Sequence, residues 1–374
     1  MDKSKKVLVI QPYLAPYRID VYNQLSNFFD LKVLYWYHQA PEQNFNLEIL
    51  KKRSLFNYEH LNNGFTIKER VIKFDILRKI RKFKPSVIIC HEYGFFTLIP
   101  ILLSKWYKYK VIINTDDNQD MLNMTYGLRL LSRNYCLKRS AGFISINPHV
   151  QEQLNKGYPS IRNNSVCYPI LQDEKYLVQE LKSSIEISKK LFSGYNLKEK
   201  KILLFVGRLS KVKGIDLLID AFYELVKSNN DLILVLVGEG EERTMLEERV
   251  KTRDIEKQVI FPGRTDGKNL YAWYNIGQVF ILPSRFEPFG AVVNEALISG
   301  NYVIASSKVG ANFLITPENG AIFENENTPS LIQAINSFIP KIKPLHQISE
   351  IKESKSIHSF DHYTHSLINF ISDQ

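Results

Sequence analysis

The sequence predicts an α/β protein built from two doubly wound domains. Apolar runs rich in Val and Ile alternate with amphipathic segments, which is the pattern of a parallel sheet covered by helices on both faces. A chain of 374 residues is also longer than one hydrophobic core usually supports. The strand-like runs form two series, at 6–11, 31–37, 86–90, 110–114 and 142–146, and then at 201–207, 232–238, 258–263, 279–284 and 302–306.

The domain boundary is expected between the two series of strands. Residues 172–201 are rich in Lys and Ser and contain no strand pattern. We therefore predict a first domain over residues 1–185 and a second over residues 196–350. Residues 357–374 carry apolar side chains at helical spacing with no strand after them, so we expect a terminal helix that packs back onto the first domain.

The composition excludes several classes of protein. Cys90, Cys136 and Cys167 are too few and too oddly numbered for a disulfide framework, which favours a reducing compartment such as the cytoplasm. The N-terminus has no small-residue cleavage site, so we expect no secretion signal. The longest apolar run, 95–103, is interrupted by Pro100 and is about half as long as a membrane-spanning helix. We expect no transmembrane segment.

The charge is unevenly divided along the chain. Residues 1–195 carry 29 Lys and Arg against 17 Asp and Glu, whereas residues 196–374 carry 20 against 22. This asymmetry predicts that the first half meets an anionic partner, which could be nucleic acid, phospholipid or a phosphorylated substrate. No nucleic-acid-binding motif accompanies the charge, so we expect no nucleic-acid partner.

Residues 74–86, FDILRKIRKFKPS, predict a basic amphipathic helix. Ile76, Leu77, Ile80 and Phe83 share one helical face, and Lys and Arg occupy the rest. Such a helix can lie on an anionic membrane. The alternative is an ordinary surface helix whose apolar face packs against the sheet.

The stretch KILLFVGRLSKVKGIDLLIDAF has the pattern of a phosphate-binding loop. A buried strand turns at Gly207, presents Arg208 and Lys213, and then enters a helix near Gly214. This order directs helix-start amides and two cations to one place, which suits a diphosphate. A solvated loop with incidental charges is the alternative at this point.

The stretch SRFEPFGAVVNEALISG places two carboxylates eight positions apart. Helix entry is expected at Pro288 to Gly290, with Glu287 just before the helix and Glu295 in its second turn. Each carboxylate can accept hydrogen bonds from ligand hydroxyls, as an acid does with a ribose diol. An isolated Glu295 would instead be read as a surface helix residue.

Four stretches of the second half, GRLSKVKG, LVGEGEE, FPGR and PSRFEPFGAVVNEALISG, together resemble one family. They are similar to the C-terminal domain of the family 4 retaining glycosyltransferases, also called glycosyltransferases group 1. The similarity is dense over 201–334 and loose in the first half. It implies the GT-B fold, in which two Rossmann-like doubly wound domains face an interdomain cleft. It also implies transfer of a sugar from a nucleotide-sugar with retention, in which the leaving diphosphate takes the acceptor's proton.

The resemblance also implies roles for individual residues. Arg208 and Lys213, beside Gly207, would bind the donor diphosphate and stabilise the charge that develops on it. Glu295 would bind the ribose. The nucleobase would lie against the loop that contains Gly263 and Arg264. Glu287 and the backbone amides after it would bind the transferred sugar. These amides are those of Phe289, Gly290 and Ala291.

The first half contributes a predicted acceptor site. The strand at 110–114 leads into Asp116 and Asp117, the strand at 86–90 into Glu92, and Arg18 follows the first strand. Residues beyond the carboxyl ends of parallel strands form ligand sites, so we expect all four to bind the acceptor and either Asp116 or Asp117 to orient its hydroxyl. Either aspartate could instead be a helix N-cap or a solvated loop residue. Where relatives often have paired glycines, this chain has Ala15 and Pro16, so no diphosphate contact is predicted there.

The predicted activity is that of a hexosyltransferase of family 4, with Arg208, Lys213, Glu287 and Asp116 in the catalytic group. We expect a UDP-sugar as donor, a glycan or lipid-diphosphate-linked acceptor, and a role in bacterial surface polysaccharide synthesis. No cofactor and no metal are expected, and an anionic membrane surface is a further expected partner, at the inner face of the plasma membrane. A glycosidase, which also uses paired carboxylates, and a non-catalytic partner subunit of the same fold are the alternatives.

Overall fold

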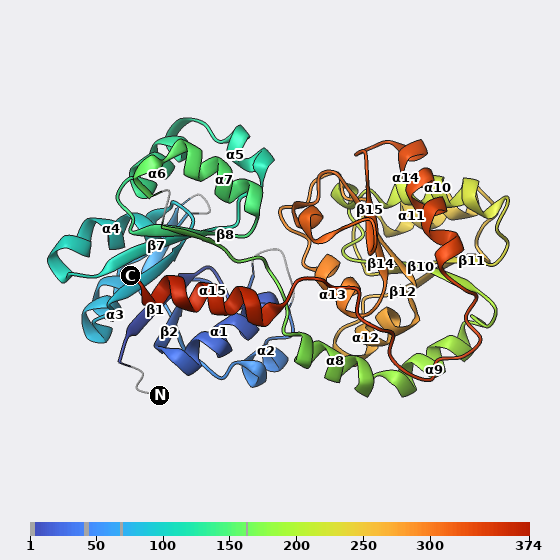
Figure 1. Cartoon of the computed structure of the whole chain (residues 1–374), viewed down its shortest axis with the longest axis horizontal. Coiled ribbons are helices and arrows are strands. Elements are labelled where there is room, and N and C mark those ends of the chain that lie inside the picture. The colour runs from blue at the N-terminus through green and yellow to red at the C-terminus, as the bar shows by residue number, and fades with distance from the viewer. Residues whose placement is uncertain (1–3, 41–44, 68–69, 162–163) are drawn as a thin grey trace. The chain divides into compact units, whose positions relative to one another are not determined.

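The structure, a computed structural model, describes residues 4–40, 45–67, 70–161 and 164–374. Its contacts divide the chain into two compact units. Unit 1 comprises Met1–Leu171 and Phe360–Gln374, and unit 2 comprises Gln172–Ser359. The chain therefore leaves unit 1 once and returns to it for its last helix (Figure 1).

Unit 1 contains a seven-stranded parallel sheet in the order β3-β2-β1-β6-β7-β8-β9. The central strand β1 pairs with β2 and β6, so the strand order reverses beside it. A separate antiparallel hairpin is formed by β4 and β5. The strands are β1 (Lys6–Gln11), β2 (Asp30–Tyr35), β3 (Asn57–His60), β4 (Gly64–Ile67), β5 (Arg70–Lys73), β6 (Val87–His91), β7 (Lys110–Thr115), β8 (Gly142–Ser145) and β9 (Ser165–Cys167).

Helices cover both faces of this sheet. α1 packs against β2 and α15, whereas α3 packs on β1, and α4 packs on β6, β7 and α6. Figure 1 shows α1, α2 and α15 on one side of the strands and α5, α6 and α7 on the other. Right-handed crossovers in opposite directions from β1 explain the two layers. The helices are α1 (Pro16–Phe28), α2 (Leu47–Arg53), α3 (Asp75–Phe83), α4 (Phe95–Tyr107), α5 (Gln119–Met124), α6 (Gly127–Leu137), α7 (Pro148–Gly157) and α15 (Phe360–Ser372).

Unit 2 repeats this plan with six parallel strands in the order β12-β11-β10-β13-β14-β15. The order reverses at β10, which pairs with both β11 and β13. Every residue of β11 and β13 is buried, as expected of central strands covered on both faces. The strands are β10 (Lys201–Val206), β11 (Leu232–Val237), β12 (Val259–Gly263), β13 (Val279–Leu282), β14 (Tyr302–Ser306) and β15 (Gly320–Phe323).

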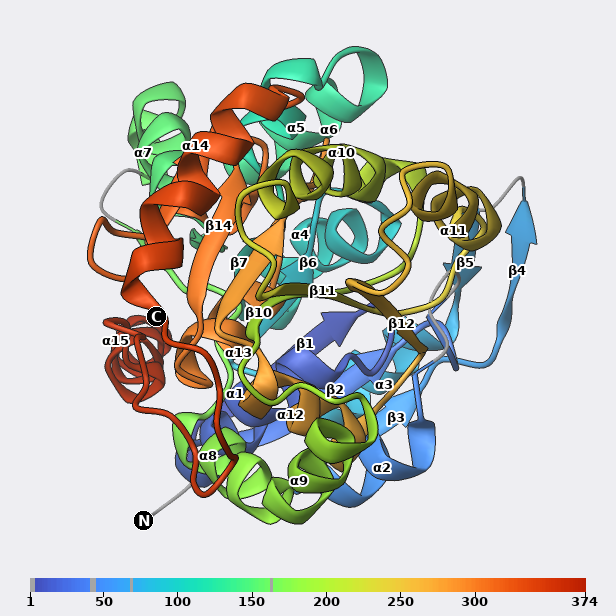
Figure 2. The same ribbon diagram turned by 90° about the vertical axis from the view of Figure 1, so that its right-hand side faces the viewer.

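The helices of unit 2 also form two layers. α10 packs against α11 and α14, and α12 packs against α8 and α9. Figure 2 shows α10, α11 and α14 above the strands and α8, α9 and α12 below them. The helices are α8 (Glu174–Ser183), α9 (Ile185–Gly194), α10 (Ile215–Val226), α11 (Arg243–Lys251), α12 (Gly267–Ile276), α13 (Val292–Ile298) and α14 (Thr328–Phe338).

The predicted fold class is confirmed. All ten expected strands form, and they fall into two Rossmann-like sheets. The strands that the sequence did not predict are β3, β4, β5, β9 and β15, each of three or four residues. They are short, and β3 (NYEH) and β9 (SVC) contain no fully buried residue, so no apolar run marks them.

The predicted domain limits need correction at two places. Residues 172–185 were assigned to the first domain, but α8 lies in unit 2, where Leu177 and Leu181 are buried and Asn275 of α12 donates a 2.9 Å hydrogen bond to the Leu181 carbonyl. Unit 2 also extends beyond residue 350 to Ser359. There Lys352 is half-buried and donates to the carbonyls at the end of α12, including that of Tyr274 at 2.8 Å.

The helix α3 packs most of its predicted apolar face into unit 1, whereas Leu77 of that face is 37% exposed. Ile76 and Ile80 are 0% and 1% exposed and belong to the core of unit 1. Phe83 is half-buried, with the ammonium groups of Lys6 and Lys32 over its ring. The alternative of an ordinary surface helix is therefore the one that the structure supports. Within the described residues, no helix has both the length and the apolar character to cross a bilayer.

The terminal helix α15 packs against β9 and α1 in unit 1. Its residues Phe360, Leu367 and Ile371 are at most 3% exposed. The helix therefore completes one apolar layer over the strands of unit 1, although it follows the whole of unit 2 in the chain.

We predict that Leu367→Ala destabilises unit 1 by about 2 to 5 kcal/mol, because it removes a buried side chain and leaves a cavity. Asn369→Ala, an exposed position on the same helix, is the matched control and should change the free energy of unfolding by less than about 0.5 kcal/mol. Urea unfolding followed by circular dichroism measures both. Equal stability of the two variants would show that α15 is not part of the core of unit 1.

Candidate functional site

The predicted donor residues gather at one edge of the sheet of unit 2. Arg208 follows β10, Arg264 follows β12, and Glu287 follows β13. These strands run parallel, so their carboxyl ends lie at the same edge. The order reverses at β10, and the crevice at such a reversal is where ligands of doubly wound sheets bind.

The loop after β10 is shaped by close backbone approaches. It runs through a 3-10 turn at Lys211–Lys213 to Gly214, whose φ is +65°. A Cβ at Gly214 would lie 2.2 Å from the carbonyl oxygen of Pro283, so only glycine lets this loop approach the end of β13 so closely. Lys213 is thereby brought next to the loop that carries Glu287.

Arg285 holds these two loops together. Its guanidinium donates two 2.9 Å hydrogen bonds to the carboxylate of Asp216 in α10 and one of 2.7 Å to the carbonyl of Lys211. It also pairs with Glu326 at 3.0 Å. A bidentate arginine contact fixes orientation as well as distance. Burial alone would raise the pKa of Asp216, but the hydrogen bonds and charge of Arg285 outweigh it and lower that pKa.

Lys213 and Glu287 form an ion pair. Their side chains are 20% and 14% exposed, so the pair is largely shielded from solvent. Arg208 is exposed, and its guanidinium has no hydrogen bond or ion pair with any of the described residues. The loop thus combines one cation fixed against a carboxylate with a second cation that faces solvent.

Glu295 is positioned by two residues that the sequence did not single out. Its Oε2 accepts a 2.9 Å hydrogen bond from the hydroxyl of Tyr274, and its Oε1 accepts one from Gln172. The backbone amide of Gln172 in turn donates to Asn294 at 3.0 Å. Tyr274 is fully buried, and this burial, with Glu295 next, raises its pKa well above the usual value. The hydroxyl therefore remains a donor to the carboxylate.

The helix that carries Glu295 begins later than expected. α13 starts at Val292, so Glu295 lies in its first turn rather than its second. The loop before it contains Gly290 with φ of +91°, a conformation that glycine adopts without strain. Pairing of Glu287 with the segment at Val309 holds that loop in an extended conformation and delays the helix.

The backbone amides after Glu287 are free to donate to a ligand, but the side chain of Phe289 is buried and does not face the site. Phe289 is 3% exposed and packs against Phe313. Among the backbone hydrogen bonds of the described residues, none is donated by Phe289, Gly290 or Ala291. Phe289 can therefore meet a ligand only through its backbone.

Gly263 and Arg264 lie at the end of β12, near the loops after β11 and β10. The amide of Gly238 donates to the carbonyl of Gly263 at 3.0 Å, and the amide of Gly207 donates to that of Val237 at 3.0 Å. Gly263 has φ of +83°, and a Cβ there would lie 3.1 Å from a carboxylate oxygen of Glu239. The predicted nucleobase loop is therefore a neighbour of the predicted diphosphate loop.

The predicted acceptor residues of unit 1 also come together. Arg18, from α1, is 5% exposed and pairs with Oδ1 of Asp116, which also accepts a 3.1 Å hydrogen bond from Asn114. The imidazole of His91 lies near the other oxygen of Asp116, with Nδ1 3.9 Å from Oδ2. Burial tends to raise the pKa of Asp116, but the charge of Arg18 outweighs this effect and lowers it.

Glu92 and Asp117 form the second half of this cluster. Oε1 of Glu92 accepts a 2.8 Å hydrogen bond from the backbone amide of Asp116. Arg129 of α6 joins the two acids, at 3.0 Å from Oδ1 of Asp117 and 3.4 Å from Oε2 of Glu92. Burial, and the charges of Asp117 and Asp116, raise the pKa of Glu92; burial also raises that of Asp117.

The alternative of a helix cap does not account for either aspartate. The N-cap of α5 is Asn118, whose side chain accepts from the amide of Met121 at 2.8 Å. Glu92 has φ of +57°, a left-handed conformation that is rare outside glycine and often found at functional sites. His91, Asn114 and Arg129 are members of the cluster that the sequence did not reveal, since their contacts join separate loops.

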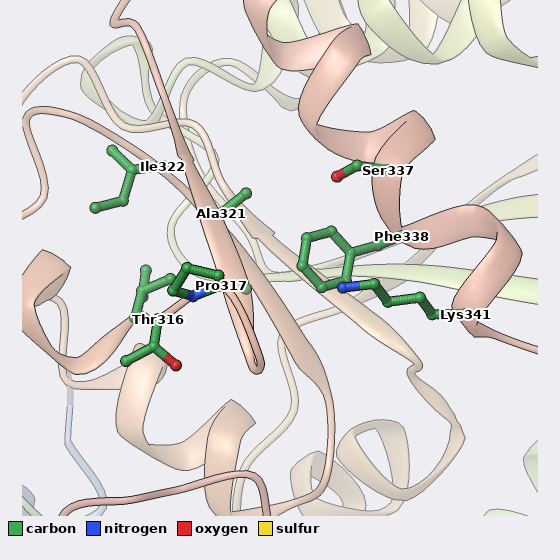
Figure 3. A pocket seen from close by; sticks show the side chains of 9 residues that line it. Thr316, Pro317, Ala321, Ile322, Ser337, Phe338 and Lys341 are labelled. Carbon is green, nitrogen blue, oxygen red and sulfur yellow. The ribbon is translucent and has the colours of Figure 1, made fainter.

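A small cavity of about 20 Å³ in unit 1 is lined by Arg18 and Asn114, whereas a larger one in unit 2 lies apart from the predicted site. A cavity of about 370 Å³ lies between β15 and α14, and none of its nine lining residues is a predicted site residue. Figure 3 shows Lys341 and Phe338 there, with the ammonium 4.0 Å from the ring centroid. In the part of the chain that the structure describes, no three His, Cys, Asp or Glu side chains are placed to hold a metal ion.

Residues 188–355 match the family described as glycosyl transferases group 1. An uncharacterized glycosyltransferase of Methanocaldococcus jannaschii is 35% identical over 134 residues, which are 36% of this chain and 34% of that protein. The lipopolysaccharide 1,2-N-acetylglucosaminetransferase of Salmonella typhimurium is 32% identical over 163 residues, 41% of this chain and 42% of that protein. The chain thus spans only about a third to two fifths of the length of these relatives.

The likeness to solved structures covers the whole chain. HepE of Anabaena, crystallised in complex with UDP, superposes with a TM-score of 0.77 at 16% identity, over 99% of this chain and 100% of that one. A likeness at this identity concerns the fold alone. The two Rossmann-like units of this chain have the GT-B fold.

We predict that the buried state of Glu92 makes stability depend on pH. A carboxyl whose pKa is higher in the folded chain than in the unfolded chain destabilises the fold as the pH rises from the unfolded towards the folded value. Glu92→Gln cannot ionise, so its stability relative to the native chain should increase between about pH 5 and about pH 8, by at most about 1.4 kcal/mol per pH unit. Urea unfolding across this range measures the difference.

Glu59→Gln is the matched control. Hydrogen bonds from Lys32 and Lys79 lower the pKa of Glu59 to about 2, so this carboxylate is ionised in both states throughout the tested range. Its stability difference from the native chain should therefore be constant. A constant difference for Glu92→Gln as well would mean that Glu92 is already ionised at pH 5.

Proposed function

We propose that this chain is a retaining hexosyltransferase of family 4, which moves a sugar from a nucleotide-sugar to a glycan or lipid-diphosphate-linked acceptor. The observation that carries the proposal is the arrangement at the strand ends of unit 2. There Arg208 and the Lys213–Glu287 pair follow adjacent strands, within the segment that matches glycosyl transferases group 1. We place the reaction in bacterial surface polysaccharide synthesis, at the inner face of the plasma membrane.

The proposed chemistry separates the roles of the two cations. As the bond between the sugar and the diphosphate breaks, negative charge develops on the leaving oxygen, and Arg208 and Lys213 stabilise it. Preorganised donors lower the barrier because they need no reorientation during the reaction. Lys213 is held by Glu287, and Glu287 is held by the backbone bridge to Val309. The leaving diphosphate takes the proton of the acceptor hydroxyl, so no protein nucleophile and no metal are required.

UDP is the proposed nucleotide. HepE of Anabaena has been crystallised with UDP and with UDP-glucose, and its fold is that of this chain. In our proposal Glu295, oriented by Tyr274 and Gln172, accepts hydrogen bonds from the ribose hydroxyls. The acceptor hydroxyl is assigned to Asp116 and its neighbours in unit 1, because this carboxylate is 28% exposed while its partner Arg18 is buried.

Ligand binding and turnover test the proposal together. UDP should raise the unfolding temperature more than GDP or ADP, since a ligand at 100 times its Kd stabilises the folded state by about 2.7 kcal/mol. With a UDP-sugar, release of UDP should require an added acceptor. Rapid release without acceptor would instead indicate a hydrolase, and no response to any nucleotide would indicate a non-catalytic subunit.

Arg208→Ala tests the role of charge stabilisation. We expect kcat to fall about 10²- to 10³-fold, because the arginine acts on charge that is present chiefly in the transition state. The Kd of the donor should rise much less. Lys251→Ala removes one exposed cation of unit 2 outside these loops and should leave both constants unchanged. Equal losses in kcat and in donor affinity would contradict the assignment.

Tyr274→Phe tests the positioning of Glu295. Loss of the hydroxyl removes the 2.9 Å hydrogen bond to Oε2, so the carboxylate is less well oriented for the ribose. We expect the KM for the UDP-sugar to rise about tenfold, equivalent to about 1.4 kcal/mol, with kcat nearly unchanged. Tyr302→Phe, in strand β14 of the same unit, is the control. A fall in kcat at constant KM would show that Tyr274 acts on the chemical step instead.

A further inference from the structure

One region of unit 1 exposes an unusual number of large apolar side chains. Of the seventeen such side chains that are exposed in the described part of the chain, seven lie between residues 102 and 131. Single exposed apolar residues are normal on a protein surface, but a concentration of them marks an interaction surface. We call these seven the apolar surface of unit 1: Leu102, Trp106, Tyr107, Met124, Tyr126, Leu128 and Leu131.

Four members of the apolar surface are close in sequence. Met124, Tyr126, Leu128 and Leu131 are 71%, 84%, 77% and 64% exposed and occupy the end of α5 and the start of α6. No described residue of unit 1 covers more than a minor part of these side chains. An eight-residue stretch that exposes this many large apolar groups needs a compensating environment outside the unit.

The other three members lie on α4, which packs against α6. Trp106 is 76% exposed, Leu102 is 52% exposed, and Tyr107 is 39% exposed. The hydroxyl of Tyr107 accepts a 2.6 Å hydrogen bond from Arg81 of α3, whose guanidinium also lies 5.8 Å from the centre of its ring. In this way the basic helix α3 adjoins the aromatic end of α4.

Within residues 74–139, every exposed charged side chain is positive. Residues 74–139 contain twelve Lys and Arg and five Asp and Glu. Ten of the twelve cations are exposed, whereas none of the five acids is. The exposed cations lie on the same helices as the apolar surface or next to them, at Arg78, Arg81, Lys82, Lys84, Lys105, Lys108, Lys110, Arg129, Lys138 and Arg139.

We infer that the apolar surface of unit 1 docks on an anionic lipid bilayer. Exposed Leu and Met side chains enter the acyl boundary, Trp and Tyr favour the headgroup level, and Lys and Arg bind the lipid phosphates. A protein partner would also bury the apolar groups, but the uniform positive charge around them matches a surface that is anionic everywhere. The α3 helix contributes mainly cations, because Ile76 and Ile80 of its apolar face are buried in the core, although Leu77 is 37% exposed.

Docking on this surface would bring lipid close to the proposed acceptor site. Arg129 lies between Leu128 and Leu131 in α6, and its guanidinium reaches Asp117 and Glu92. This step rests on the proposed function. Given that function, the acceptor is amphipathic: its polar end meets the carboxylate cluster, and its lipid part remains in the bilayer beneath α5 and α6.

The docking itself is tested without any sugar or nucleotide. The full chain is sedimented with vesicles of phosphatidylcholine alone and with vesicles that also contain phosphatidylglycerol. We expect it to pellet with the anionic vesicles and to be released by high salt. A variant with Trp106→Ser, Leu128→Ser and Leu131→Ser should lower the partition coefficient about tenfold or more, because three apolar side chains no longer enter the lipid.

A matched control removes equally exposed apolar groups elsewhere. Leu55, Ile357 and Met245 are 80%, 63% and 42% exposed and lie outside the apolar surface, so their triple replacement by Ser should leave the partition coefficient within about twofold. Trp106 supplies a second measurement. Of the three tryptophans, Trp273 is 1% exposed and Trp36 is stacked on Phe96. Brominated lipid should therefore quench Trp106, and Trp106→Phe should abolish this quenching while vesicle binding persists.

Several results would overturn the inference. The first is that the native chain does not pellet with anionic vesicles. The second is that the two triple variants bind vesicles equally. The third is that the native chain does not bind vesicles but forms a dimer in solution, and that the variant with Trp106→Ser, Leu128→Ser and Leu131→Ser is a monomer. The last result would assign the surface to a second copy of the chain. A chain that binds vesicles but shows no response to UDP would refute the proposed function and leave the docking surface intact, so the two failures are distinguishable.

Discussion

The arginine contact between the two loops of unit 2 is the constraint on which the proposed donor site depends. Arg285 binds Asp216 with two hydrogen bonds and the Lys211 carbonyl with a third. The loop after β10 is thereby fixed against the loop after β13, and the ion pair of Lys213 with Glu287 becomes possible at low exposure. A lysine side chain loses conformational entropy when it is fixed in one position. In this fold the ion pair with Glu287 already fixes Lys213, so less of that entropy remains to be lost on ligand binding. The site is consequently organised by residues that need not contact a ligand themselves.

In unit 1, burial shifts the pKa values of the carboxyl groups in the predicted acceptor site. Its carboxylates are placed at the carboxyl ends of β6 and β7, where desolvation opposes their charge. The charge of Arg18 outweighs desolvation at Asp116 and lowers its pKa. Glu92 and Asp117 share Arg129, and their pKa values remain raised. Neighbouring acids with pKa values moved in opposite directions can take different protonation states near neutral pH, which is a recurring property of functional clusters.

Much of the fold was predictable because central strands of a parallel sheet are continuous apolar runs, and all ten of those runs became strands. The edge strands β9 and β15 lack such runs and were missed. The site residues were predictable where a motif joins nearby positions, as with Arg208 and Lys213. Tyr274, Gln172 and Arg129 act across long separations in sequence, and nothing in the local pattern reveals them. The start of α13 was misjudged because the bridge between Glu287 and Val309 is a tertiary contact.

The apolar surface of unit 1 was also not predictable from the sequence. Periodicity marked residues 74–86 as amphipathic, but amphipathic character alone does not distinguish a face that meets the sheet from one that meets lipid. Burial distinguishes the two cases: Ile76 and Ile80 of α3 belong to the core, while Leu128 and Leu131 of α6 are 77% and 64% exposed. The basic helix α3 and the exposed apolar groups of α4, α5 and α6 therefore belong to different helices, and only the folded unit makes them neighbours. Arg129 then connects that surface to the buried acids, since a side chain that is 52% exposed contacts one that is fully buried. A change of environment around α6 would act on Arg129 directly, and through it on the charge balance of Glu92 and Asp117.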